Sequence, residues 1–168
     1  MNSRLRFAQV WFAAVIALAM ASPSPAETFR VATYNIENYL DHTAGTRGPK
    51  SAEAKAKVRE SIHALKPDVI CFQEMGRVGA LRELQQSLKA EGLDLPYWEH
   101  VTGFDTNIHV ALLSKFPIVA RRPHTNDNFL LSGRRYRVSR GILDVDIQVN
   151  DRYAFTLIGA HLKSKRPV

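Results

Sequence analysis

Four polar side chains lie at the ends of segments that have the composition of β-strands. They are Asn35, Glu74, Arg140 and His161. A carboxylate can hold a divalent cation such as Mg²⁺, while a guanidinium and an imidazole can bind the oxygens of a phosphoryl group. Each residue alone is a weak signal, but the ordered set favours the hydrolysis of a phosphate ester.

Glu74 follows the most strongly patterned stretch of the chain. Val69–Phe72 is an unbroken apolar run between Pro67 and Gly76, which predicts a short strand buried on both faces. A carboxylate at the end of such a strand is costly unless something pairs with it, and ligands gather at the carboxyl ends of strands in open α/β sheets. Glu74 is therefore a candidate metal ligand or acid–base group. The alternative is a helix cap or a surface ion pair.

The elements before this strand predict where Glu74 lies relative to Asn35. Residues 29–34 are rich in β-formers, and Ser51 can cap a helix that Pro67 ends. A strand–helix–strand order implies a right-handed parallel crossover. If the two strands are neighbours, Asn35 and Glu74 emerge at the same edge of the sheet.

The second part of the chain predicts further strands. The expected elements are a helix through Leu81–Leu88, strands over 97–101 and 109–114, and a hairpin whose strands 143–149 and 153–161 meet at Asn150–Asp151. With that turn, Leu143 faces Ile158, and the same register places Arg140 opposite His161. Two basic groups that close together favour an anion between them, so the pair is interpreted as a phosphate clamp.

Charge is unevenly distributed along the chain. Residues 121–140 contain six arginines and only one acid, Asp127, and this stretch is predicted to be a loop. A basic loop suits a polyanion, although a solvated basic surface is the alternative. Cys71 is the only cysteine, which excludes a disulfide framework and a thiolate metal cluster. Its place in the apolar run predicts a small buried hydrophobe.

The N-terminus has the features of a secretory signal. Arg4 and Arg6 precede the mostly apolar stretch Phe7–Ala21, and small residues at Ser24 and Ala26 predict cleavage after residue 26. The apolar stretch falls short of the ~20 residues that span a bilayer, so a membrane anchor is disfavoured. The mature chain, residues 27–168, then carries 21 basic and 16 acidic side chains, a net charge of +5. A secreted or periplasmic protein is expected.

The ordered motifs resemble those of the endonuclease/exonuclease/phosphatase superfamily, which includes pancreatic-type deoxyribonucleases, abasic-site endonucleases, bacterial sphingomyelinases and inositol polyphosphate phosphatases. The matching segments are Thr33–Asn38, Pro67–Glu74, Ala111–Ile118, Arg140–Gly141 and His161–Lys165. The resemblance implies a two-sheet α/β sandwich of the deoxyribonuclease-like type with its active site along one edge.

The resemblance also assigns roles to individual residues. It implies that Glu74 is the ligand of a divalent metal, Mg²⁺ with Mn²⁺ or Ca²⁺ as alternatives, and that Asn35 lies beside it and orients the metal, its water or the phosphate. Arg140 matches a phosphate-contacting arginine. His161 matches a histidine that binds the scissile phosphate or aids proton transfer. The resemblance also implies that Asn107 or Asp105 lies near the substrate, with Asn107 as the phosphate-binding residue.

The resemblance covers the first half of the superfamily's pattern. A Gly-Asp-Phe-Asn motif and a late Asp-His pair are absent from the sequence. Residues 27–168 are therefore expected to form only the N-terminal part of the domain, a mixed sheet with flanking helices. The second sheet is expected to be missing.

These observations predict a secreted, metal-dependent phosphoesterase. A nuclease is favoured because residues 121–140 and the basic segment Lys163–Arg166 suit a nucleic acid or another polyanionic phosphodiester. A phospholipid or inositol-phosphate hydrolase is the alternative within the same class, and Phe129–Leu131 is the one short apolar candidate for a membrane loop. From another class, a catalytically incomplete fragment that binds polyanions remains an alternative.

Overall fold

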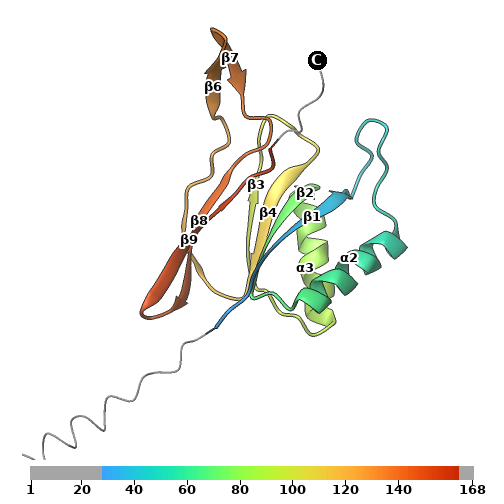
Figure 1. The fold of residues 1–168 in the computed structure, drawn as a ribbon. Helices are drawn as coiled ribbons and strands as arrows, with labels where there is room; N and C mark the ends of the chain where they lie inside the picture. Colours follow the sequence, from blue (N-terminus) through green and yellow to red (C-terminus); the bar gives the residue numbers. More distant parts are fainter. Residues whose placement is uncertain (1–27, 163–168) are drawn as a thin grey trace, which may run out of the picture.

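The computed structural model describes residues 28–162, which form three layers: two helices, a four-stranded sheet and a second sheet (Figure 1). The expected signal segment and Lys163–Arg166 lie outside these residues. The elements are β1 (Val31–Tyr39), α2 (Ala52–Leu65), β2 (Val69–Met75), α3 (Val78–Ala90), β3 (Tyr97–Val101), β4 (His109–Ser114), β5 (Ile118–Arg121), β6 (Asn128–Leu131), β7 (Arg134–Arg137), β8 (Leu143–Asn150) and β9 (Tyr153–Gly159). Neither helix is long and apolar enough to cross a bilayer.

The first sheet has the strand order β1-β2-β4-β3, in which β1 and β2 are parallel and the other pairs antiparallel. The predicted parallel pairing of these two strands is confirmed, and Asn35 pairs with Gln73. β1 continues further than predicted. Glu37 and Asn38 take positive φ angles of 48° and 53°, which interrupts the register before the strand resumes at Tyr39.

The first helix begins and ends where the sequence predicts, and α3 covers the predicted Leu81–Leu88. The Ser51 hydroxyl accepts a hydrogen bond from the Ala54 amide at 3.2 Å, and α2 ends at Lys66 in a left-handed conformation just before Pro67. On each helix, apolar residues spaced three or four apart are buried against one face of the sheet. Ile62 of α2 and Leu84 of α3 are examples. These contacts fix the helical layer.

β2 is buried on both faces, which explains its unbroken apolar run. Ile70 and Phe72 pack in the cluster beneath the helices, whereas Val69 and Cys71 pack in a second cluster on the opposite face. That second cluster includes Val145 of a three-stranded sheet with the order β5-β8-β9. The expectation that the second sheet would be missing is therefore wrong, since the chain folds three strands of it over β2.

The predicted register of the β8–β9 hairpin is wrong by one residue. Leu143 pairs with Gly159 instead of Ile158, because the turn lies at Asp151–Arg152, one residue later than predicted, so that Asn150 pairs with Tyr153. The irregularity between Gln148 and Asn150 then reverses one residue of this two-residue change in register. A shift of one residue exchanges the faces of β9, so Ile158 is 69% exposed. Only glycine fits at 159, where a Cβ atom would lie 2.5 Å from the Cys71 sulfur. The predicted pairing of Arg140 with His161 falls outside both strands.

The basic stretch 121–140 is not a loop as predicted. It contains the two-stranded hairpin β6–β7, which stands out from the rest of the structure (Figure 1). Ser132 and Gly133 have φ angles of 49° and 73°, so they form the two-residue turn with positive φ at both positions that suits a tight hairpin. Phe129 and Tyr136 stack across the hairpin with ring centroids 5.8 Å apart. Arg134, Arg135 and Arg137 thus lie on a defined projection.

Candidate active site

Glu74 lies where β2 leaves the sheet, and the irregular end of β1 holds its carboxylate. One oxygen accepts a hydrogen bond from the Asn35 side-chain amide at 3.3 Å, and the other accepts one from the backbone amide of Asn38 at 3.1 Å. Glu74 has a φ of 63°, and Asn38 also lies in the left-handed region. Strained backbone of this kind is typical of functional sites. The predicted closeness of Asn35 and Glu74 is observed.

His161 lies just after β9 and faces the same carboxylate. Its Nε2 atom is 3.7 Å from the nearer Glu74 oxygen, and its buried Nδ1 atom has no hydrogen-bond partner. Burial lowers the pKa of His161, the positive charge of Arg140 lowers it further, and the carboxylates of Glu74 and Asp105 act in the opposite direction. The neutral imidazole is therefore favoured at neutral pH.

Arg140 is held against the loop that joins β3 and β4 by two glycines in close contact. A Cβ atom on Gly103 would lie 2.4 Å from the Gly141 amide nitrogen, so neither backbone leaves room for a side chain. The Asp105 amide donates to the Ser139 carbonyl at 2.7 Å. The Asp105 carboxylate then lies 3.6 Å from the buried Nε of Arg140, too far for a hydrogen bond.

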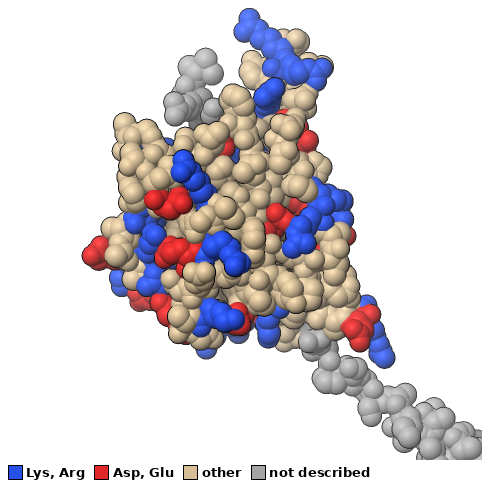
Figure 2. All heavy atoms as spheres, turned by 180° about the vertical axis from the view of Figure 1, so that it is seen from behind, with Lys and Arg blue, Asp and Glu red and all other residues tan. Residues whose placement is uncertain are grey.

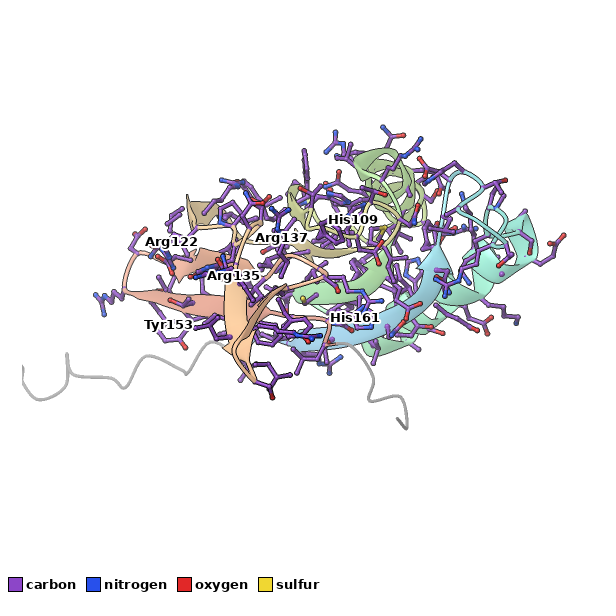
Figure 3. All side chains as sticks on the ribbon, turned by 90° about the horizontal axis from the view of Figure 1, so that it is seen from above. His109, Arg122, Arg135, Arg137, Tyr153 and His161 are labelled. Atoms are coloured by element: carbon purple, nitrogen blue, oxygen red, sulfur yellow. The ribbon has the colours of Figure 1, made fainter. Side chains whose placement is uncertain are left out.

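The structure brings most of the predicted site residues to one edge. Asn35, Glu74, His161 and Arg140 are linked by hydrogen bonds or by charge effects, and Asp105 joins them through Arg140. Figure 3 looks down on this edge and shows His161 among the side chains there. Asn107 is exposed at its margin, where its backbone amide donates to Asp105 at 2.9 Å.

Two groups near the site were not predicted from the sequence. The backbone amide of Asn38 could not be found from residue type, because only the interrupted strand turns it toward Glu74. His109 was assigned to a strand with no role, yet it is buried with an unpartnered Nδ1 atom. A histidine at the start of an otherwise apolar strand was the available signal.

The edge carries the carboxylates of Glu74 and Asp105 but no larger group of metal-binding side chains among the described residues. Within residues 28–162, no three histidine, cysteine, aspartate or glutamate side chains group closely enough to form a metal cluster. Glu74 can therefore contribute one anionic ligand, while Asn35 keeps it oriented. The arrangement can bind an anion through Arg140 and His161 beside a carboxylate, which is the combination expected of a site for phosphate esters.

Comparison with known proteins agrees with the fold. The sequence profile described as Endonuclease/Exonuclease/phosphatase family matches residues 32–155, so the chain belongs to that family. The predicted superfamily and the deoxyribonuclease-like fold are confirmed. None of the curated proteins matches the chain.

Two solved structures share the fold at low sequence identity. A β-hairpin deletion mutant of beta toxin from Staphylococcus aureus has a TM-score of 0.56 and 18% identity, with 83% of this chain and 52% of that one covered. An endonuclease/exonuclease/phosphatase family protein from Leptotrichia buccalis C-1013-b has a TM-score of 0.52 and 15% identity, with 81% and 54% covered. The chain thus spans about half the length of the structures it matches.

Proposed function

We propose that the full-length protein is a divalent-metal-dependent phosphodiesterase. The observation that carries this proposal is the Glu74 carboxylate, held by Asn35 and the Asn38 amide, with His161 3.7 Å away. Arg140 adds a positive charge that acts on the same histidine. A surface that only binds polyanions needs positive charges and no carboxylate. The oriented Glu74 carboxylate beside Arg140 and His161 therefore favours a catalytic site.

The residues at this edge fit Mg²⁺. Mg²⁺ is commonly bound by one or two carboxylates together with waters and substrate phosphate, so Glu74 is sufficient as a protein ligand. The Oδ1 atom of Asn35 already accepts the Glu37 amide at 3.0 Å, and its Nδ2 atom donates to Glu74. We therefore assign Asn35 to positioning the carboxylate. When bound, the ion would neutralise phosphate charge and activate water.

Arg140 and His161 would act on the phosphoryl group directly. The guanidinium makes no hydrogen bond through its buried Nε atom, and a phosphate oxygen would provide a charge-assisted partner for its other nitrogens. Neutral His161 carries one ring proton. At Nε2, which faces Glu74, that proton can be donated to a phosphoryl oxygen that enters between the two side chains. Both groups would stabilise charge that develops in the transition state.

The basic hairpin supports a nucleic acid as the substrate. Arg134, Arg135 and Arg137 all lie on β7, and Figure 2 shows positive side chains gathered on this projection. The Arg137 guanidinium lies 5.7 Å from the ring centroid of Phe104, which belongs to the loop that contacts Arg140. The hairpin is therefore next to the site, where it could bind phosphates that flank the scissile one.

A second candidate is supported by the other side chains of the hairpin. Phe129, Leu130 and Leu131 are 49%, 67% and 57% exposed. Aliphatic side chains beside arginines are also what an anionic lipid surface binds. A phospholipid hydrolase thus remains a candidate, whereas an inositol-phosphate hydrolase has no separate observation in its favour.

The test compares substrates on the full-length protein with and without a chelator. We expect hydrolysis of plasmid DNA or RNA that EDTA abolishes and Mg²⁺ restores. Hydrolysis of phospholipid vesicles that Leu130→Asp reduces would favour the lipid enzyme, with Ile158→Asp as the control at another exposed apolar position. Binding of DNA without hydrolysis of any phosphodiester would instead support the non-catalytic polyanion-binding protein.

We also propose that the protein is exported, on the basis of the N-terminal pattern. The mature protein would begin at Glu27. Mass spectrometry of the protein recovered from the periplasm or the medium measures this terminus. An intact Met1 on the recovered soluble protein would contradict the proposal.

A further inference from the structure

Glu74 lies in an interrupted part of β2. This strand pairs with β1 up to Gln73 and with β4 up to Phe72, and both ladders resume at Met75. Neither neighbouring strand therefore pairs with Glu74, whose φ of 63° is uncommon for a residue other than glycine. A strained conformation of this kind persists only where the surrounding structure holds it, so the segments on both sides of the gap must be fixed.

Gly76 fixes the chain directly after this gap. It is buried, and its amide donates to the Tyr39 carbonyl at 2.9 Å. A Cβ atom on Gly76 would lie 2.6 Å from the same carbonyl oxygen, so the two backbones are in close contact. The Gly76 carbonyl accepts a hydrogen bond from the Nε2 atom of His100 at 2.8 Å. Because a carbonyl oxygen only accepts, Nε2 carries a proton in this bond whether the His100 ring is neutral or protonated.

His100 reaches Gly76 from a strand that is not a neighbour of β2. The residue lies on β3, and β4 separates the two strands in the sheet. The His100 ring packs against the ring of His109 on β4, with centroids 4.8 Å apart. His109 is only 4% exposed and pairs with Met75 at the point where the ladder resumes. The edge strand β3 thus contributes a side chain that holds the end of β2.

The bond from His100 acts on the candidate site through the backbone. Gly76 follows Glu74 by two residues, and the Glu74 carboxylate accepts the Asn38 amide from the other side of the gap at 3.1 Å. A buried carbonyl that loses its partner is costly, so removal of the His100 donor favours a rearranged segment. If Glu74 then relaxes toward ordinary strand geometry, its side chain changes direction and the bond to the Asn38 amide is lost.

We propose that His100 is a positioning residue, which holds Glu74 in its metal-binding orientation through the Gly76 carbonyl. The inference rests on the proposed function, because this orientation serves catalysis only if Glu74 binds the ion. In this role His100 does not contact the phosphoryl group.

The test compares two amide side chains at position 100 of the full-length protein. In His100→Gln the amide nitrogen stands near the Nε2 position and can still donate to Gly76. In His100→Asn it stands near the Nδ1 position and falls short. The measurement is hydrogen exchange of the Asn38 amide by NMR without metal, which reports the bond to Glu74. We expect exchange about tenfold faster in His100→Asn and within threefold of the unmodified protein in His100→Gln.

A matched control separates positioning from a general loss of stability. Gln85 on α3 is 7% exposed, and its side-chain amide donates to the Leu95 carbonyl at 2.6 Å. Gln85→Met therefore removes a buried bond between a side chain and a backbone carbonyl, as His100→Asn does. This variant should lower Tm but leave hydrogen exchange at Asn38 unchanged.

Mg²⁺ binding by calorimetry and hydrolysis of bis(p-nitrophenyl) phosphate provide the functional readouts. His100→Asn should weaken Mg²⁺ binding about fivefold and lower kcat about tenfold with KM within about twofold, and His100→Gln should restore both. Equal exchange at Asn38 in the two His100 variants, equally fast exchange in Gln85→Met, or Mg²⁺ binding unchanged in His100→Asn would overturn the inference. The expected exchange pattern in a protein that neither binds Mg²⁺ nor hydrolyses the ester would support the positioning of Glu74 and remove the proposed function.

Discussion

Replacing Glu74 by glutamine tests the centre of the proposed site, since it keeps the shape and removes the charge. In the structure, both carboxylate oxygens accept hydrogen bonds, one from Asn35 and one from the Asn38 amide. The new amide nitrogen would have to face one of these donors. Asn35 cannot turn its own amide without losing the bond from the Glu37 amide. The variant therefore loses about one hydrogen bond, worth about 1 kcal/mol of stability.

The expected effect on catalysis is much larger than the effect on stability. A divalent ion supplies several kcal/mol of transition-state stabilisation, and each 1.36 kcal/mol corresponds to a factor of about ten in rate. If Glu74→Gln loses most of that contribution, kcat should fall on the order of a hundredfold or more. The loss of one hydrogen bond should lower Tm by only about 2 to 4 °C.

The assay is hydrolysis of bis(p-nitrophenyl) phosphate by the full-length protein over a range of Mg²⁺ concentrations. Glu37→Gln is the matched control, because Glu37 is an exposed glutamate on the same irregular end of β1. NMR titration adds a second measurement. The Glu74 carboxylate raises the pKa of His161, so its neutralisation should lower that pKa further. A kcat within threefold of the unmodified protein, with an unchanged requirement for Mg²⁺, would refute the assignment of Glu74.

Three further expectations follow from buried positions. Gly141→Ala places a Cβ atom 2.4 Å from the Thr102 carbonyl oxygen and should cost about 2 kcal/mol or more in denaturant unfolding, whereas Gly48→Ala, with nothing within 4 Å, should be neutral. The pKa of His109 is about 4 in the folded protein, against an ordinary value of 6.5 for histidine. Between pH 4 and pH 6.5 the unfolded state therefore binds a proton that the folded state does not. Stability should fall as the pH is lowered from 6.5 to 4, by up to about 1.4 kcal/mol per pH unit, and a His109→Gln protein with a parallel pH profile would contradict this. Burial raises the pKa of the Cys71 thiol to about 12, so it should not react with Ellman's reagent until the protein is unfolded; rapid labelling of the folded protein would show that this layer opens.

The sequence determined the elements whose signals are local. The apolar run of β2, the Ser51 cap and the stop at Pro67 each depend on neighbours within a few residues, and each is found where it was predicted. The strand–helix–strand order also predicted the parallel pairing that brings Asn35 beside Glu74, because a helix between two neighbouring strands carries the chain back to the same end of the sheet.

Register and contacts between distant segments were decided by the tertiary structure. The sequence predicted a turn at Asn150–Asp151, whereas the turn lies at Asp151–Arg152 and the ladder is shifted by one residue. This register places Gly159 against Cys71 and buries Leu157. The same holds for residues 121–140, where a composition typical of a loop concealed two short strands.

The candidate site shows this division most directly. Residue types at strand ends indicated that Glu74, Arg140 and His161 could act on a phosphate ester. The structure alone decided that His161 approaches Glu74 to 3.7 Å, and that Arg140 reaches the same place through the contact between Gly103 and Gly141. A local pattern specifies how a chain is buried and where it turns, whereas the distance between remote side chains depends on the packing of whole layers.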